Sequence, residues 1–191
     1  MGGGKVGDCR LPSQIVVLNG ASSAGQTCLG RCLQRQLGAG WFLLGVDDLL
    51  RAILPTVDDA ELLSVSSDGV VDTSDAFRRA EAAWYAGVAE IARRAPGVIV
   101  DEVLLGGATS RARLAEALTG LPVFWVGVVC DPGVGLQRER LREDRVIGMH
   151  AQQRERVHQG MNYDHVVDTT MLTADEAAQE VLLAVRAQRR R

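Results

Sequence analysis

Gly20-Ala21-Ser22-Ser23-Ala24-Gly25-Gln26-Thr27 is the stretch that decides the fold of this chain. It matches the phosphate-binding P-loop pattern G-x-x-x-x-G-K-[ST], except that Gln26 occupies the lysine position. The mainly apolar residues 14–19 before it are typical of a buried strand, and residues 28–37 after it have helical spacing. In such a strand–turn–helix, backbone N–H groups converge on a phosphate at the positive end of the helix dipole. The sequence therefore predicts a phosphate-binding loop at residues 20–27.

The length of the chain fits one domain. Its 191 residues are enough to bury a core, and no linker-like composition divides them. We therefore expect a single domain over residues 14–191, after a loose N-terminal extension at residues 1–13. Hydrophobic residues make up 47% of the chain and charged residues 24%, which is ordinary for a soluble globular protein.

Charge and cysteine usage limit the partners and the compartment. The net charge of −3 provides no basic field for nucleic acid or an anionic membrane. No apolar run reaches the roughly 20 residues of a membrane helix, and the first residues lack the apolar core of a signal peptide. The four cysteines lack zinc-site spacing. We expect a cytoplasmic protein with reduced thiols and no nucleic-acid or membrane partner, and the sequence leaves homo-oligomer formation open.

Strands alternate with helices along the rest of the chain. Strand-like runs occur at residues 41–46, 98–105, 123–129 and 166–168, and helical spacing occurs at residues 75–94, 110–118 and 174–186. Residues 56–73 suit a small hairpin. This alternation predicts a three-layer α/β fold, with a central parallel sheet covered by helices on both faces. Ligands of such sheets bind at the carboxyl ends of the strands, where Asn19, Asp47, Asp101 and Asp131 fall.

Thr27 and Asp101 are the candidate ligands of a magnesium ion. The hydroxyl at the last P-loop position ordinarily contacts Mg²⁺. Asp101 follows the apolar residues 98–100, where a Walker-B-type carboxylate would hold the ion directly or through water. The alternative role of Asp101 is that of a turn residue at the end of a strand.

Asp47 is the candidate catalytic base. It ends a strand beside the P-loop, and a carboxylate there can accept the proton of a substrate hydroxyl. Its neighbour Asp48 would point elsewhere and could cap the following helix. The alternative is that both carboxylates only cap that helix.

Several arginines lie close together in residues 138–145, after the strand-like run at residues 123–129. Arg142 and Arg145 are the candidates for gripping the transferred phosphoryl group, with Arg138 and Arg140 as weaker ones. Gly148 follows them, which favours a mobile lid over this segment. The interleaved acidic residues support the alternative of a salt-bridged, exposed helix.

Taken together, these stretches resemble the chloramphenicol phosphotransferases of actinomycetes. The resemblance is collinear from about residue 14 onward. It is carried by Leu18-Asn19-Gly20, Ser22-Ser23-Ala24-Gly25, Arg31-Cys32-Leu33-Gln34, Gly45-Val46-Asp47, Leu105-Gly106-Gly107, Trp125-Val126-Gly127-Val128, Cys130-Asp131, Asp144-Arg145-Val146, Val157-His158 and Val167-Asp168-Thr169-Thr170.

The resemblance implies a P-loop kinase fold of the nucleotide-kinase type with a lid segment. It also implies transfer of the γ-phosphoryl group of ATP, with Mg²⁺, to the primary hydroxyl of chloramphenicol, which inactivates the drug. By position, Asp47 matches the family's base, Thr27 its magnesium-binding hydroxyl and Asp101 its strand-end acid. Arg142 and Arg145 match its lid arginines. Residues 54–75 differ most from the family. The identity of the acceptor, a small hydroxylated molecule, is therefore the family property that carries over to this chain least securely.

Gln26 is the main departure from the family, which has lysine at this position. A glutamine can donate a hydrogen bond to a phosphate but brings no charge, so it stabilises the transition state less, by about 3–5 kcal/mol. The protein is then impaired, or lid arginines supply the charge, or the substitution was introduced deliberately. Two alternatives to an active drug kinase stay open at this stage. One is a nucleotide- or drug-binding protein without turnover, and the other is a nucleoside-type kinase.

Overall fold

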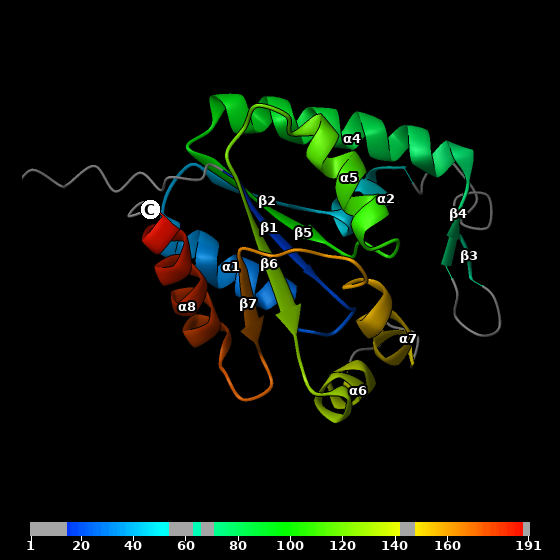
Figure 1. Ribbon diagram of the computed structural model, residues 1–191, viewed down its shortest axis with the longest axis vertical. Coiled ribbons are helices and arrows are strands. Elements are labelled where there is room, and N and C mark those ends of the chain that lie inside the picture. Colours follow the sequence, from blue (N-terminus) through cyan, green and yellow to red (C-terminus); the bar gives the residue numbers. More distant parts are fainter. Residues whose placement is uncertain (1–14, 54–62, 66–70, 142–147, 189–191) are drawn as a thin grey trace, which may run out of the picture.

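The computed structural model describes residues 15–53, 63–65, 71–141 and 148–188. Its main sheet has five strands in the order β2-β5-β1-β6-β7, and every neighbouring pair is parallel (Figure 1). The bounds of these strands are β1 (Ile15–Gly20), β2 (Trp41–Gly45), β5 (Gly97–Glu102), β6 (Val123–Val129) and β7 (His165–Asp168). The predicted parallel sheet is confirmed, and all its carboxyl ends lie at one edge.

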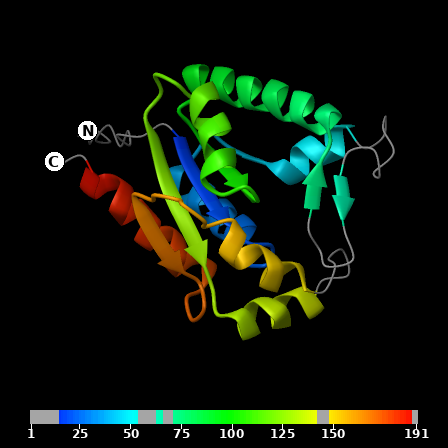
Figure 2. The same ribbon diagram turned by 45° about the vertical axis from the view of Figure 1, so that its right-hand side comes forward.

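Helices cover both faces of this sheet, so the predicted three-layer architecture is confirmed. In Figures 1 and 2, α1 and α8 lie on one face and α4 and α5 on the other, while α6 and α7 lie side by side beyond the carboxyl ends of the strands. The helices are α1 (Gln26–Leu37), α2 (Val46–Ile53), α4 (Asp75–Arg94), α5 (Ala108–Ala117), α6 (Pro132–Arg140), α7 (Met149–Arg156) and α8 (Ala174–Ala187). No helix in the described ranges is long and apolar enough to cross a membrane.

The alternating side chains of β1 build two hydrophobic cores. Val16 and Leu18 pack on the α1 and α8 side, whereas Ile15 and Val17 pack on the α4 and α5 side. All four are fully buried. Because both faces of β1 are buried, the strand is apolar throughout and sits in the middle of the sheet. The P-loop that follows β1 is therefore fixed to the most deeply buried part of the molecule.

Local sequence signals set several element ends. Ser74 caps α4 by accepting a hydrogen bond from the N–H of Phe77 at 3.1 Å, and Thr173 with Glu176 forms a capping box at α8. The small hairpin expected within residues 56–73 is present as β3 (Leu63–Val65) paired antiparallel with β4 (Val71–Thr73).

Candidate functional site

The P-loop has the backbone shape of an anion-binding turn. Ser23 has a φ of 63° and Gly25 a φ of 94°, so both lie in the left-handed region, and α1 begins directly after Gly25. Consecutive turns of this kind point backbone N–H groups into one concave space. A side chain at residue 25 would be strained at this φ, which explains the requirement for glycine.

Gln26 does not present its amide donors as a lysine would present its ammonium group. Its Nε2 donates hydrogen bonds to the backbone oxygens of Gly20 at 3.1 Å and Glu102 at 2.8 Å. The residue is 5% exposed. Both N–H bonds of the amide are thus used within the protein, where they tie the P-loop to the end of β5. A hydrogen bond from Gln26 to a phosphate therefore requires its amide to leave these carbonyls.

The side chains of Thr27 and Asp101, the two candidate magnesium ligands, are in contact. Oγ1 of Thr27 donates a hydrogen bond to Oδ2 of Asp101 at 2.7 Å. The contact exists because β5 lies next to β1, which places the end of β5 beside the first turn of α1. Hydroxyl and carboxylate oxygens are ligands that suit Mg²⁺, so the donor set here fits that ion.

Asp47 lies where two cavities meet. One cavity of about 610 Å³ runs over the P-loop and the start of α1, and a second of about 340 Å³ lies between α2, α4 and the end of β5. Ser22, Val46, Asp47 and Val103 line both cavities. Because α2 begins directly after β2, Asp47 lies in the first turn of this helix rather than on a strand. A group held in either cavity would thus lie near the same carboxylate.

Asp48 caps the start of α2, as expected. Gly45 directly precedes this helix, and the carboxylate of Asp48 in its first turn accepts a hydrogen bond from the N–H of Gly45 at 2.9 Å and pairs with Arg51 at 2.7 Å. Asp48 lines only the larger cavity.

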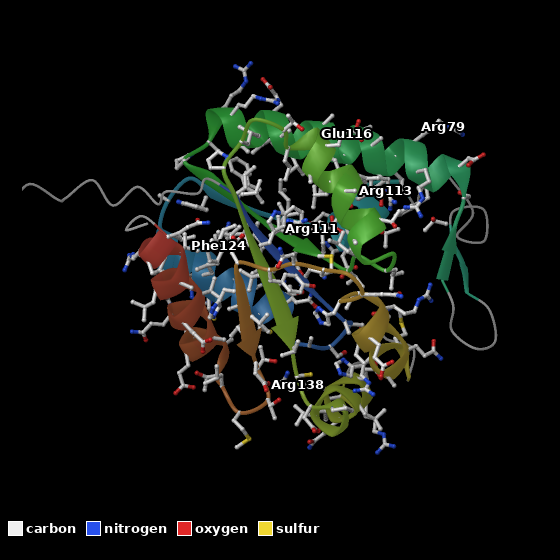
Figure 3. The ribbon with its side chains drawn as sticks, viewed as in Figure 1. Arg79, Arg111, Arg113, Glu116, Phe124 and Arg138 are labelled. Carbon is white, nitrogen blue, oxygen red and sulfur yellow. The ribbon has the colours of Figure 1, made fainter. Side chains whose placement is uncertain are left out.

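The two predicted lid arginines, Arg142 and Arg145, lie outside the described residues. Helix α6, which precedes them, ends at Arg140. Arg138, which the sequence ranked lower, extends from α6 toward the ends of the strands (Figure 3). Its guanidinium donates to the backbone oxygen of Thr169 at 2.8 Å and to Oγ1 of the same residue at 3.1 Å. It lines the larger cavity beside Gly25, so it brings positive charge to the P-loop.

Two side chains of helix α7 contact the backbone of the P-loop at Ser22. Oε1 of Gln153 accepts a hydrogen bond from the N–H of Ser22 at 2.8 Å, and Nδ1 of His150 lies 2.8 Å from the Ser22 oxygen. Both side chains are buried. No local sequence pattern predicts this contact, because Ser22 and its two partners are far apart in the chain.

Asn19, at the carboxyl end of β1, connects three segments. Its Oδ1 accepts from the N–H of Leu104 at 2.9 Å. Its Nδ2 donates to the oxygen of Val157 at 2.8 Å and to the hydroxyl of Tyr163 at 2.6 Å. This fully buried amide therefore fixes the position of the strand end from which the P-loop starts.

A P-loop on the central strand of a five-stranded parallel sheet, with a hydroxyl–carboxylate pair behind it, defines a protein of the P-loop kinase class. The family model described as chloramphenicol phosphotransferase-like protein matches residues 13–186, so the chain belongs to that family. It is a kinase-type phosphotransferase.

One curated relative is similar in sequence, and solved structures are similar in fold. The chain is 28% identical over 184 residues to "Putative O-phosphotransferase Rv2636" of Mycobacterium tuberculosis, a match covering 88% of this chain and 80% of the relative. The fold is similar to shikimate kinase from Acinetobacter baumannii, with a TM-score of 0.62, 17% identity and coverage of 94% and 97% of the two chains. It is also similar to the tunicamycin resistance protein of Deinococcus radiodurans, with a TM-score of 0.62, 19% identity and coverage of 92% and 95%.

Proposed function

We propose that this protein transfers the γ-phosphoryl group of ATP, with Mg²⁺, to a hydroxyl of chloramphenicol or a related small natural product. Such a transfer would inactivate an antibiotic in the cytoplasm, where ATP is available. The family membership supports the reaction class. The choice of acceptor rests on the sequence resemblance to the family's drug-phosphorylating members.

The single observation that carries the proposal is the position of Asp47 between the two cavities. The larger cavity contains the P-loop residues, Thr27 and Asp101, so we assign it to the nucleotide. The second cavity is lined mostly by α2, α4 and the segment after β5, so we assign it to the acceptor. Asp47 is then within reach of the place where the two substrates meet.

The proposed step is an in-line displacement. The acceptor hydroxyl gives its proton to the Asp47 carboxylate as its oxygen bonds to the γ-phosphorus, and the bond from that phosphorus to the β–γ bridging oxygen breaks to release ADP. Thr27 and Asp101 would hold the magnesium ion, which neutralises charge on the phosphate oxygens. Arg138 and the arginines Arg142 and Arg145 are the proposed cations for the remaining charge.

Gln26 supports a second candidate, a nucleotide- or drug-binding protein with little turnover. Its amide is held by two backbone oxygens and carries no charge for the phosphates. A protein of this kind would bind ATP through its loop backbone and stabilise the transition state poorly.

The deciding experiment measures the mass of the product after incubation with ATP, Mg²⁺ and chloramphenicol. Phosphorylated chloramphenicol from the parent protein would support the proposal. Thermal stabilisation by ATP or chloramphenicol without any phosphorylated product would favour the binding protein. A matched Asp47→Asn protein controls for a contaminating kinase, because it should bind ATP normally and form product at least about 100-fold more slowly.

A further inference from the structure

The hydroxyl group of Ser22 is a buried polar group to which the proposed function gives no role of its own. Ser22 is the third residue of the P-loop and is 6% exposed. Within the described part of the chain, its Oγ has no hydrogen-bond partner. A buried hydroxyl without a partner is unfavourable in a folded protein unless water or a ligand completes it. The hydroxyl is therefore available to a bound molecule.

Ser22 lies where the two cavities meet. Four described residues line both the cavity assigned to the nucleotide and the cavity assigned to the acceptor. Two of them are valines, and the two with polar side chains are Ser22 and Asp47, the proposed base. A group held between the two substrates would thus lie near both polar side chains. In the proposed reaction that group is the γ-phosphoryl group, which passes from one cavity to the other.

The backbone of Ser22 is not free to make this contact, because both of its polar groups are used within the protein. Its N–H donates a hydrogen bond to Oε1 of Gln153 at 2.8 Å, and its carbonyl oxygen lies 2.8 Å from Nδ1 of His150. In an anion-binding loop, backbone N–H groups ordinarily contact the phosphates. At this position of the loop, the side-chain hydroxyl is the donor that remains.

The other hydroxyl groups of the P-loop are placed differently. The hydroxyl of Ser23 is also buried without a partner, but Ser23 lines only the larger cavity. The hydroxyl of Thr27 donates to Asp101 and also lies in the larger cavity. Of the three hydroxyl groups in residues 20–27, that of Ser22 is thus the one that faces both substrates.

The missing lysine increases the need for a donor at this point. Both N–H bonds of the Gln26 amide are directed to backbone oxygens of the protein. Charge on the phosphoryl oxygens in the transition state is stabilised by donors that are already in place when the reaction begins. A serine hydroxyl can donate to one of these oxygens and keep its own proton, because the proton of the acceptor goes to Asp47.

We infer that Ser22 is a catalytic residue, whose hydroxyl donates a hydrogen bond to an oxygen of the γ-phosphoryl group while this group moves from ATP to the acceptor. The inference rests on the proposed function, because that function places the γ-phosphoryl group where the cavities meet. It also gives the hydroxyl a role in nucleotide choice. ADP has no γ-phosphoryl group, so the contact favours the triphosphate over the diphosphate.

Two variants separate the hydroxyl from the shape of the loop. Ser22→Ala removes the hydroxyl and Ser22→Thr keeps it, and both retain the backbone atoms that α7 contacts. Without ligands, Ser22→Ala should melt at a temperature no lower than the parent, because the hydroxyl has no partner to lose. A fall of about 3 °C or more would overturn the inference, since it would mean that the hydroxyl is bonded within the fold.

The main test uses calorimetry with Mg²⁺ and without an acceptor, and it compares ADP with the β,γ-imido analogue of ATP. We expect Ser22→Ala to bind the ATP analogue about tenfold or more weaker than the parent and ADP within about twofold, and Ser22→Thr to restore most of the loss. Equal weakening for both nucleotides would overturn the inference in favour of a role in loop shape. Unchanged binding of the analogue would overturn it as well, as would a parent that binds neither nucleotide.

The rate of transfer provides a second readout. At saturating ATP and Mg²⁺, Ser22→Ala should lower kcat for phosphorylation of chloramphenicol about 100-fold, with the chloramphenicol KM within about threefold. An unchanged kcat would overturn the catalytic role. If the parent phosphorylates nothing, the proposed function fails, while the comparison of the two nucleotides still decides whether the Ser22 hydroxyl contacts the γ-phosphoryl group.

Discussion

Restoring the lysine of the P-loop is the sharpest perturbation that this structure suggests. In the parent, Nε2 of Gln26 is held by the oxygens of Gly20 and Glu102. The lysine side chain of Gln26→Lys is longer than that of glutamine, so its ammonium group can reach the phosphates from the same position of α1. It would add the full positive charge that the glutamine amide lacks.

The magnitude follows from charge and distance. A unit charge about 4 Å from a phosphate oxygen, at an effective dielectric constant of about 20, contributes roughly 4 kcal/mol. If most of this appears only in the transition state, the rate of transfer rises about 10²- to 10⁴-fold. Losing the two hydrogen bonds of the Gln26 amide costs about 1 kcal/mol each, which lowers stability but does not limit the rate.

The assay is the rate of formation of phosphorylated chloramphenicol at saturating ATP and Mg²⁺. Gln26→Met is the matched control, because it removes the same hydrogen bonds without adding charge. It should be less stable than the parent and no faster. A lysine variant within about threefold of the parent rate would refute the reasoning, since another cation would then already supply the charge. An equal rise in the transfer rate of Gln26→Met would assign the effect to the loss of the hydrogen bonds that hold the loop, and not to the added charge.

Five further substitutions test other parts of the protein. Asp47→Asn should lower the rate of transfer about 10²- to 10⁴-fold with ATP affinity nearly unchanged by calorimetry, whereas Asp48→Asn should lose stability but keep most activity. Thr27→Ala should raise the Mg²⁺ concentration for half-maximal activity about tenfold, and equal Mg²⁺ dependence would argue against Thr27 as a ligand. Asn19→Ala removes the partner of the Leu104 N–H and of the Val157 oxygen, while the Tyr163 hydroxyl keeps its contact with His158, and it should cost about 2–4 kcal/mol in urea unfolding. A loss under about 1 kcal/mol would contradict the role given to this amide. Burial lowers the pKa of His158 below 6.5, so the unfolded chain takes up the proton first and stability should fall as pH drops below that value. His158→Asn should remove that slope.

The fold could be predicted because its signals are local. The P-loop, the Ser74 cap and the capping box at Thr173 each depend on residues a few positions apart, and each marks an element end that the structure confirms. The apolar composition of residues 123–129 identified a buried strand for the same reason. The strand order itself was beyond the local pattern, because β1 pairs with strands that come much later in the chain.

Candidate site residues can be chosen from the sequence where a residue type has one usual chemical role at one position. Thr27 and Asp101 were chosen on that basis, and their side chains meet. The orientation of the Gln26 amide could not be predicted, since its partner at Glu102 lies on a strand that comes much later in the chain. The same is true of Glu102, whose adjacency to Asp101 hid that the two carboxyl groups face opposite sides of the sheet.

The contacts of α7 with the backbone of Ser22 determine which segments must be exchanged together when the phosphate loop is moved between proteins. The phosphate loop is not shaped by residues 20–27 alone, because its backbone donor and acceptor at Ser22 are both taken by α7. A chimera that imports only the loop from a relative would separate it from the helix that sets its shape. The smallest interchangeable module is the loop together with His150 and Gln153, and exchanges that move both parts should preserve nucleotide binding better than exchanges that move either alone.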